Sequence, residues 1–227
     1  MAAGTTTMVA TPHLDLLHGV QPHAIAPAVA AMQEELDRAG IALQVLPGAE
    51  VSAERLPELT DADLVAAALG GGGWLLLECP FTTPVRLEAV VGDLQRRGFG
   101  VLLAHPERST GLRMDPAQLV RLVEMGALTS VTASALSGGF GDTVRQFALT
   151  LFERGLVHNV ASDTHDPTRR PPGVDDGLSA AGRRLEIGPA DRRYLLSSVP
   201  HALITGVVPP RPAPAPRRRA GWRLLRR

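Results

Sequence analysis

Short apolar runs alternate along the chain with longer segments in which apolar residues recur every three or four positions. The short runs predict β-strands over residues 5–10, 42–46, 74–78, 100–104, 128–133 and 156–162. The longer segments predict helices over 24–40, 61–70, 84–98, 115–126 and 142–155, a weaker helix near 174–185 and a closing helical segment over 191–205. Because the strands are apolar on both faces, the pattern predicts an α/β fold with a parallel sheet, either open and doubly wound or a (βα) barrel.

The composition narrows the function mainly by exclusion. The 227 residues suit one domain, and the formal net charge of zero gives no general attraction to nucleic acid or membranes. The one cysteine, Cys79, excludes an internal disulfide framework and a cysteine-rich zinc site. Neither a signal peptide nor an apolar run of about 18 residues is found, so we expect a cytoplasmic protein.

The C-terminal stretch differs from the rest of the chain. Residues 209–227 hold seven arginines, five prolines and no acidic residue, so the net charge of zero divides into +7 here and −7 elsewhere. This composition predicts a disordered tail at 207–227 behind a folded domain at 1–206. The tail is either a solvated extension or a patch for an anionic surface, with Trp222, Leu224 and Leu225 as apolar anchors. We expect no specific nucleic acid as a partner.

Ionisable side chains follow five of the six predicted strands, and only strand 128–133 lacks one. The carboxyl ends of parallel strands lie on one face of the fold, where active sites form. The sequence therefore predicts that six potential metal ligands converge there, with Arg108 as a cation beside them: His13, Glu50, Glu78, His105, Asp163 and His165.

The types of ligand atom narrow the choice of metal ion. Imidazoles mixed with carboxylates suit Mn²⁺, Fe²⁺ or Zn²⁺ better than Mg²⁺ or Ca²⁺, which prefer oxygen alone. Packed carboxylates repel one another unless cations lie between them, which favours more than one ion. A single histidine after a strand is usually a capping or surface residue, so the argument depends on the joint placement. His18 and His23 are weaker candidates, and His158 and His201 are expected to be structural.

Other phosphatase and nucleotide-binding chemistries fit poorly. A cysteine-based phosphatase needs His-Cys-x₅-Arg, but Glu78 precedes Cys79 and would disfavour its thiolate. The glycines of "GGGGW" (70–74) lack the lysine and hydroxyl of a P-loop and run into a strand. No G-x-S-x-G elbow occurs.

Five motifs in order, "ATPH", "GAE", "LLLECP", "AHPER" and "ASDTHD…RPP", resemble the PHP superfamily. More narrowly, they resemble the CpsB-like tyrosine-protein phosphatases of capsular and exopolysaccharide loci. The resemblance covers roughly residues 5–185, and "AHPER" with "SDTH" is its most specific part. It implies a distorted (βα)₇ TIM-like barrel and a site of two or more ions, most often Mn²⁺, with Fe²⁺ or Zn²⁺ as alternatives.

The resemblance also implies an activity and residue roles. The reaction would be hydrolysis of phosphotyrosine, typically on a polysaccharide-export tyrosine kinase. The six residues named above would be metal ligands, with His105 and Asp163 at the reacting centre and Arg108 on the phosphate. The ions would polarise the phosphoryl oxygens and generate hydroxide. The alternatives are a PHP-type histidinol-phosphatase and a catalytically impaired binding remnant of the family.

One family feature is missing. Members begin with a strand that ends in His-x-His, whereas this chain begins at what resembles the second strand. We therefore expect the first βα unit to be absent, which removes two imidazoles from one metal position and leaves a sheet edge unpaired. A start codon assigned too far downstream, a degraded gene and a natural variant with a reduced site all remain open.

Overall fold

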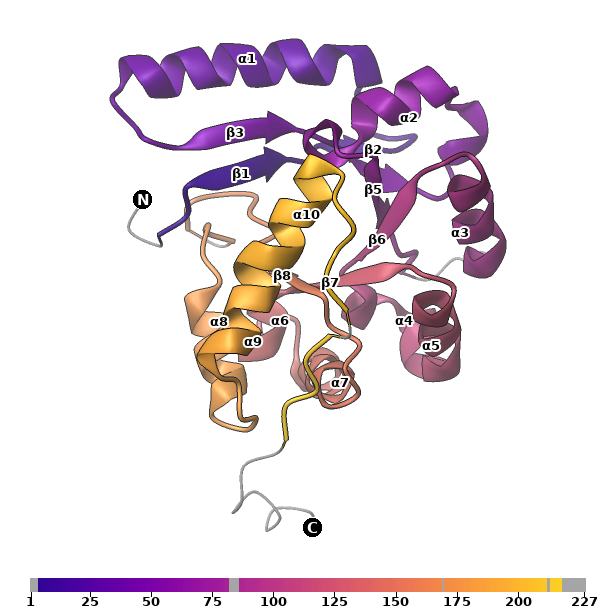
Figure 1. Cartoon of the computed structure of the whole chain (residues 1–227), viewed down its shortest axis with the longest axis vertical. Helices are drawn as coiled ribbons and strands as arrows, with labels where there is room; N and C mark the ends of the chain where they lie inside the picture. Colours follow the sequence, from indigo (N-terminus) through magenta and orange to yellow (C-terminus); the bar gives the residue numbers. More distant parts are fainter. Residues whose placement is uncertain (1–3, 82–85, 169, 212, 218–227) are drawn as a thin grey trace.

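The computed structural model describes residues 4–81, 86–168, 170–211 and 213–217 (Figure 1). Within them, a two-stranded parallel sheet pairs β1 (Thr7–Ala10) with β3 (Gln44–Pro47). A six-stranded parallel sheet has the order β2 (His13–Leu14), β4 (Glu50–Ser52), β5 (Trp74–Glu78), β6 (Gly100–Ala104), β7 (Leu128–Thr132) and β8 (Asn159–Ala161). The strand order of the larger sheet follows the chain order, as repeated βα units require, and the predicted α/β fold is confirmed.

The first two predicted strands are present as β1 and β3, and each is followed, after a proline, by a short strand that the sequence did not predict. Strand β1 ends before Thr11-Pro12 and β2 begins at His13, while β3 ends at Pro47 and β4 begins at Glu50. Proline has no N–H to donate to a ladder, so pairing stops there and resumes a few residues later. The backbone stays in line, since the Glu50 amide donates to the Pro12 carbonyl at 3.1 Å. Two short strands thereby begin at His13 and Glu50.

Ten α-helices connect and cover the strands of the described chain. They are α1 (Pro22–Arg38), α2 (Asp61–Ala67), α3 (Leu87–Arg96), α4 (Thr110–Met114), α5 (Pro116–Glu124), α6 (Ala133–Ser137), α7 (Asp142–Glu153), α8 (Asp175–Gly182), α9 (Pro189–Arg193) and α10 (Val199–Thr205). Every predicted helix is present, and the predicted closing segment divides into α9, a π-helical turn and α10. The sequence did not predict the one-turn helices α4 and α6.

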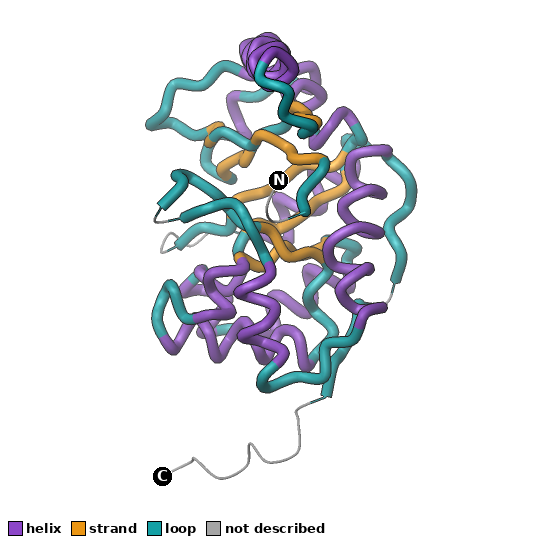
Figure 2. The backbone as a smooth tube through the Cα atoms, turned by 90° about the vertical axis from the view of Figure 1, so that its left-hand side faces the viewer, coloured by secondary structure: helices purple, strands orange, loops and turns teal. Residues whose placement is uncertain are grey.

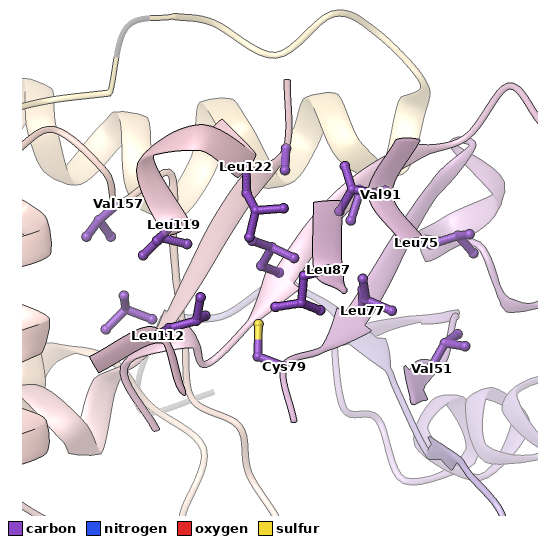
Figure 3. Close-up of a cluster of buried hydrophobic side chains, with 14 of the residues drawn as sticks. Val51, Leu75, Leu77, Cys79, Leu87, Val91, Leu112, Leu119, Leu122 and Val157 are labelled. Carbon is purple, nitrogen blue, oxygen red and sulfur yellow. The ribbon is translucent and has the colours of Figure 1, made fainter. Parts of the chain in front are cut away.

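One face of the larger sheet carries the main core. Alternate strand residues such as Leu75, Leu77, Val101 and Leu103 point to this face and are fully buried. Helix α3 adds Leu87, Val91 and Leu94, which recur at helical spacing, and α5 adds Leu119 and Leu122 (Figure 3). Burying each such side chain is worth about 1.5–3 kcal/mol, so this layer fixes the strand positions.

The opposite face of the larger sheet is divided into an apolar and a polar end. At the amino ends of the strands, Leu102 and Leu128 pack against Val199 and Leu203 of α10. Helix α10 also lies very close to the backbone at Gly72. A Cβ on Gly72 would lie 2.0 Å from the Leu203 carbonyl oxygen, so only glycine fits there. Figure 1 shows α10 crossing in front of the strands, and Figure 2 shows connecting loops gathered on one side of them. The ionisable residues of this face lie toward the carboxyl ends of the strands.

The expected barrel is only partly tested. In the described chain β2 and β8 are the outer strands of the larger sheet and do not pair with each other. A parallel sheet of this kind is compatible with the expected barrel, whose closure stays a prediction.

The beginning of the predicted tail differs from the expectation of disorder. The Tyr194 hydroxyl donates to the Pro210 carbonyl at 3.0 Å, Arg211 donates to the Gly126 carbonyl at 2.7 Å, and Ala213 is buried. Prolines stiffen this segment, which lowers the entropy lost when its carbonyls and Arg211 bind the domain. The anchors Trp222, Leu224 and Leu225 lie outside the described residues. Among the described helices, none has the length and hydrophobicity to cross a bilayer.

Candidate metal centre

The sheet register brings the six predicted ligand residues to one end of the fold. His13 and Glu50 are paired positions of β2 and β4, and Glu78 ends β5. His105 follows β6 directly, while Asp163 and His165 follow β8. Because all six strands are parallel, these positions lie on the same edge of the sheet.

The strands β2, β4 and β5 supply the tightest cluster. One ligand atom from each of His13, Glu50 and Glu78 lies within 4.8 Å of the others. Nε2 of His105 is 2.7 Å from Oε1 of Glu50, which is itself 4.0 Å from Nδ1 of His13. Glu50 and His105 are each only 4% exposed, so this polar cluster is shielded from bulk solvent.

The loop after β8 brings a second group of side chains toward the first. The ring of His165 lies 5.8 Å from the ring of His13, and its Nδ1 is 3.7 Å from the Asp163 carboxylate. That carboxylate accepts hydrogen bonds from Arg108, at 3.1 Å, and from Arg170. The Arg170 carbonyl in turn accepts from the His165 amide at 3.1 Å, which folds the loop back on itself.

A cavity of about 110 Å³ opens between these groups. Its size is sufficient for several water molecules or for ions with their ligands. Five of the six predicted ligand residues line it, together with Arg108, Arg170 and the ring of Phe81; the lining is His13, Glu78, Phe81, His105, Arg108, Asp163, His165 and Arg170.

Two aromatic rings hold Arg108 in place beside the cavity. Its guanidinium carbon lies 4.8 Å from the ring centre of Phe81 and 4.5 Å from that of Phe140. The Phe81 ring also stacks on His105 at 5.5 Å, and its carbonyl accepts from the Thr110 amide. Cation–π contacts restrict the guanidinium, so its N–H donors are held at the cavity beside Asp163.

Two of the candidate ligand residues have an unusual backbone conformation. His105 (φ 31°) and Asp163 (φ 51°) are the only described non-glycine residues with positive φ. This region is unfavourable for residues with a Cβ, and residues held in it cluster at functional sites. At His105 it lets the chain turn at once into a 3₁₀ turn (Pro106–Arg108), which places Arg108 beside the histidine.

The buried carboxylates influence one another. Burial and the Glu50 charge raise the pKa of Glu78 above its usual value. Burial also acts to raise the pKa of Glu50, but the hydrogen bond from His105 and the nearby histidines hold it below its usual value. Burial acts to lower the pKa of His105, and the bond to Glu50 overrides this and raises it. The ionised forms of Glu50 and Glu78 therefore need positive charge close by.

The donor set fits a bound cation. Two carboxylates and one imidazole already have ligand atoms within 4.8 Å of one another. Nδ1 of His105 is buried without a hydrogen-bond partner among the described residues. Nitrogen and oxygen donors together suit a borderline divalent ion, and His105 and the Asp163–His165 pair lie beside the cluster.

Four residues of the site were not predicted, or not with the right role. Arg170, Phe81 and Phe140 come from loops, and only the "RPP" motif signalled Arg170. Glu107 follows His105 by two residues, yet it is fully buried and its Oε1 accepts from the Thr132 amide at 2.9 Å. Glu107 therefore ties β7 to the turn after β6.

The other histidines and Cys79 lie in different surroundings. His18 stacks on His13 at 5.2 Å, and its Nδ1 lies 2.7 Å from Asp15. His23 is exposed on α1, and His158 is buried and accepts from the Thr129 amide at 3.2 Å. The Cys79 sulfur lies among leucines of the core (Figure 3), where burial and the Glu107 charge raise the pKa of the thiol. A protonated, buried thiol is not a nucleophile.

Comparison with known proteins identifies the family. Residues 1–205 match the family described as "Capsular polysaccharide synthesis, CpsB/CapC". The chain belongs to the CpsB/CapC family. This confirms the resemblance that the five sequence motifs predicted.

Relatives of known name or structure agree with this assignment. "Tyrosine-protein phosphatase YwqE" of Bacillus subtilis is 36% identical over 171 residues, which are 74% of this chain and 66% of YwqE. "Tyrosine-protein phosphatase CpsB" of Streptococcus pneumoniae is 29% identical over 46% of this chain and 45% of its own length. This chain thus spans about two thirds of YwqE in that match.

A solved structure covers nearly the whole fold. It comes from a study titled "Crystal structures of YwqE from Bacillus subtilis and CpsB from Streptococcus pneumoniae, unique metal-dependent tyrosine phosphatases". The TM-score is 0.80 at 29% identity, over 96% of this chain and 88% of the solved one. The α/β architecture of this CpsB/CapC chain is therefore that of the YwqE and CpsB structures.

Proposed function

We propose that this CpsB/CapC chain is a metal-dependent phosphoesterase that hydrolyses phosphotyrosine in proteins. The observation that carries the proposal is that five candidate metal ligands and two arginines line the same cavity. These residues are His13, Glu78, His105, Asp163 and His165, with Arg108 and Arg170. Such a cavity combines cation ligands with two groups that bind phosphoryl oxygens. The names of YwqE and CpsB support the tyrosine-phosphatase reading.

The metal would be held by the three clustered residues and their neighbours. We assign His13, Glu50 and Glu78 as its nearest ligands, with His105, Asp163 and His165 completing a site for two or more ions. The ion would be Mn²⁺, as the family resemblance implies, with Fe²⁺ or Zn²⁺ as alternatives. When bound, the metal supplies a Lewis acid for the phosphoryl oxygens and lowers the pKa of bound water.

The protein's own side chains would bind and orient the phosphate ester. Arg108 and Arg170 both reach the Asp163 carboxylate, so their guanidiniums point at one spot in the cavity. A phosphoryl group there would receive N–H donors from both and charge stabilisation as the ester bond breaks. Phe81 lines the cavity and is 38% exposed, so it offers apolar surface for the ring of a phosphotyrosine.

The proposal extends to the cellular role. The substrate would be a phosphotyrosine protein of capsular or exopolysaccharide synthesis, with a polysaccharide-export tyrosine kinase as the leading candidate. The proposed location is the cytoplasm, where the chain would meet this substrate. The Arg-rich end of the chain would be available to an anionic surface.

Substrate comparison tests the proposal. The metal-stripped chain is reloaded with Mn²⁺ and assayed on a phosphotyrosine peptide, a phosphoserine peptide and histidinol phosphate. We expect metal-dependent hydrolysis with phosphotyrosine preferred, since Phe81 lines the cavity. Preference for histidinol phosphate would support the alternative PHP activity. A folded, metal-loaded chain that hydrolyses none of the three would contradict the proposal and favour a binding remnant.

A further inference from the structure

A second and larger cavity, with none of the lining residues of the candidate metal centre, lies between α6, α7 and α8. Its volume is about 280 Å³, and its lining residues are Leu136, Ser137, Arg145, Ala180, Arg183 and Arg184. Three of these six side chains carry a guanidinium, and none carries a carboxylate. The lining is therefore strongly basic, which favours an anionic ligand.

Arg145 is anchored at one side of this cavity. It forms an ion pair with Asp142, one turn earlier on α7, and its Cδ would lie 3.7 Å from a Cβ on Gly138. Its Nε is buried without a hydrogen-bond partner among the described residues. A buried donor without a partner is costly, so an acceptor bound in the cavity would relieve that cost.

The backbone that carries the other two arginines is fixed relative to α6. Arg183 and Arg184 come directly after α8, which packs tightly on α6. A Cβ on Gly177 of α8 would lie 2.2 Å from the Ala133 carbonyl oxygen of α6. Since α8 is held so closely against α6, the backbone positions that carry Arg183 and Arg184 are fixed beside this cavity.

The basic cavity lies near the metal centre along the chain. Ser137 lines it, and Phe140, three residues later, contacts Arg108 of the metal centre. Three residues span at most about 11 Å when fully extended. The Cα atoms of Ser137 and Phe140 are therefore no more than about 11 Å apart, a separation that one extended peptide could bridge.

We propose that this basic cavity binds a phosphoryl group. Arginine is the side chain best suited to that ligand, because its planar fork pairs with two phosphoryl oxygens at once. The source is either free phosphate or a second phosphotyrosine on the peptide that the metal centre acts on. The second source rests on the proposed function, whereas the first does not.

Calorimetry with inorganic phosphate tests the site independently of catalysis. The metal-free full chain carrying Arg108→Ala is titrated, so that the catalytic cavity is weakened. We expect one phosphate to bind, with affinity reduced about tenfold by Arg183→Gln, an exposed position, and abolished by Arg145→Gln with Arg183→Gln. Arg193→Gln, an exposed change of equal charge on α9, should have no effect. Absence of binding, or binding unchanged by the double substitution, would overturn the proposal.

Peptides then distinguish the two sources. Non-hydrolysable phosphotyrosine mimics are placed once or twice in otherwise identical peptides. Tighter binding of the doubly substituted peptide, lost with Arg145→Gln and Arg183→Gln, would identify a second phosphotyrosine as the ligand. Equal affinities with phosphate binding retained would support free phosphate. If neither peptide binds while phosphate does, the proposed function fails and the basic cavity stands.

Discussion

The guanidinium of Arg108 is held on three sides, by the Asp163 carboxylate and by the rings of Phe81 and Phe140. Together these contacts fix a planar fork at the edge of the cavity. The paired N–H donors of this fork can bind two phosphoryl oxygens at once, which the compact ammonium group of a lysine could not do in the same way.

Replacing Arg108 with lysine tests that geometry. Lysine keeps the charge but loses the paired donors, so we expect Arg108→Lys to lower kcat/KM for a phosphotyrosine peptide about 10²-fold, the usual effect of removing one charge-stabilising donor. The bound metal, measured by elemental analysis, should stay unchanged. Arg121→Lys, on the surface of α5, is the control. Full activity in Arg108→Lys would remove Arg108 from the phosphate site.

Among the elements, α10 has the clearest structural role. It closes the amino-terminal end of the polar sheet face by placing Val199 and Leu203 against Leu102 and Leu128. The helix therefore contributes to stability without touching the candidate ligands.

Truncating a buried side chain of α10 should lower the stability of the protein and leave the candidate metal centre intact. We expect Leu203→Ala to reduce the free energy of unfolding by about 2–5 kcal/mol through lost burial and a cavity. Val208→Ala, at a side chain 87% exposed, should change it by less than about 0.5 kcal/mol. Urea denaturation measures both. Equal stabilities would mean that α10 does not close the core.

The pairing of β7 with β8 should make stability depend on pH. Burial, with help from the Arg211 charge, lowers the pKa of His158 from 6.5 to about 4. The unfolded chain therefore takes up the proton first as pH falls. Stability from this group is complete above pH 6.5 and is lost progressively toward pH 4, by about 3 kcal/mol in total.

Denaturation of the metal-free protein at pH 7.5 and pH 4.5 measures this loss. His158→Gln should flatten the dependence, because glutamine does not titrate. Since other groups also titrate, the difference between the two proteins is the relevant quantity. Parallel pH profiles for both would show that His158 is not buried in its neutral form.

For the molecule as a whole, the sequence predicted what depends on local pattern. Strand β6 and helix α3 were predicted correctly because their apolar spacing is uninterrupted. Strands β2 and β4 were missed because they have only two and three residues after a proline break. The contacts of Arg211 and Ala213 with the domain were also missed, because composition alone does not reveal which surface a proline-rich segment meets.

The candidate site shows the same division. Six residues were predicted together because strand ends share one edge in any parallel sheet. Phe140 and Arg170 could not be predicted by that rule, since their positions depend on how two loops fold back over the edge. The ligand role of the six residues remains a prediction that requires a direct measurement.

Metal content is that measurement. The full chain is purified without chelators and analysed for Mn, Fe and Zn beside His105→Ala, with His201→Ala, an exposed histidine on α10, as the control. We predict two or more ions per folded chain, lost in large part in His105→Ala and kept in His201→Ala. A folded chain that retains no metal, or a His105→Ala variant that retains as much as the unaltered chain, would contradict the metal centre.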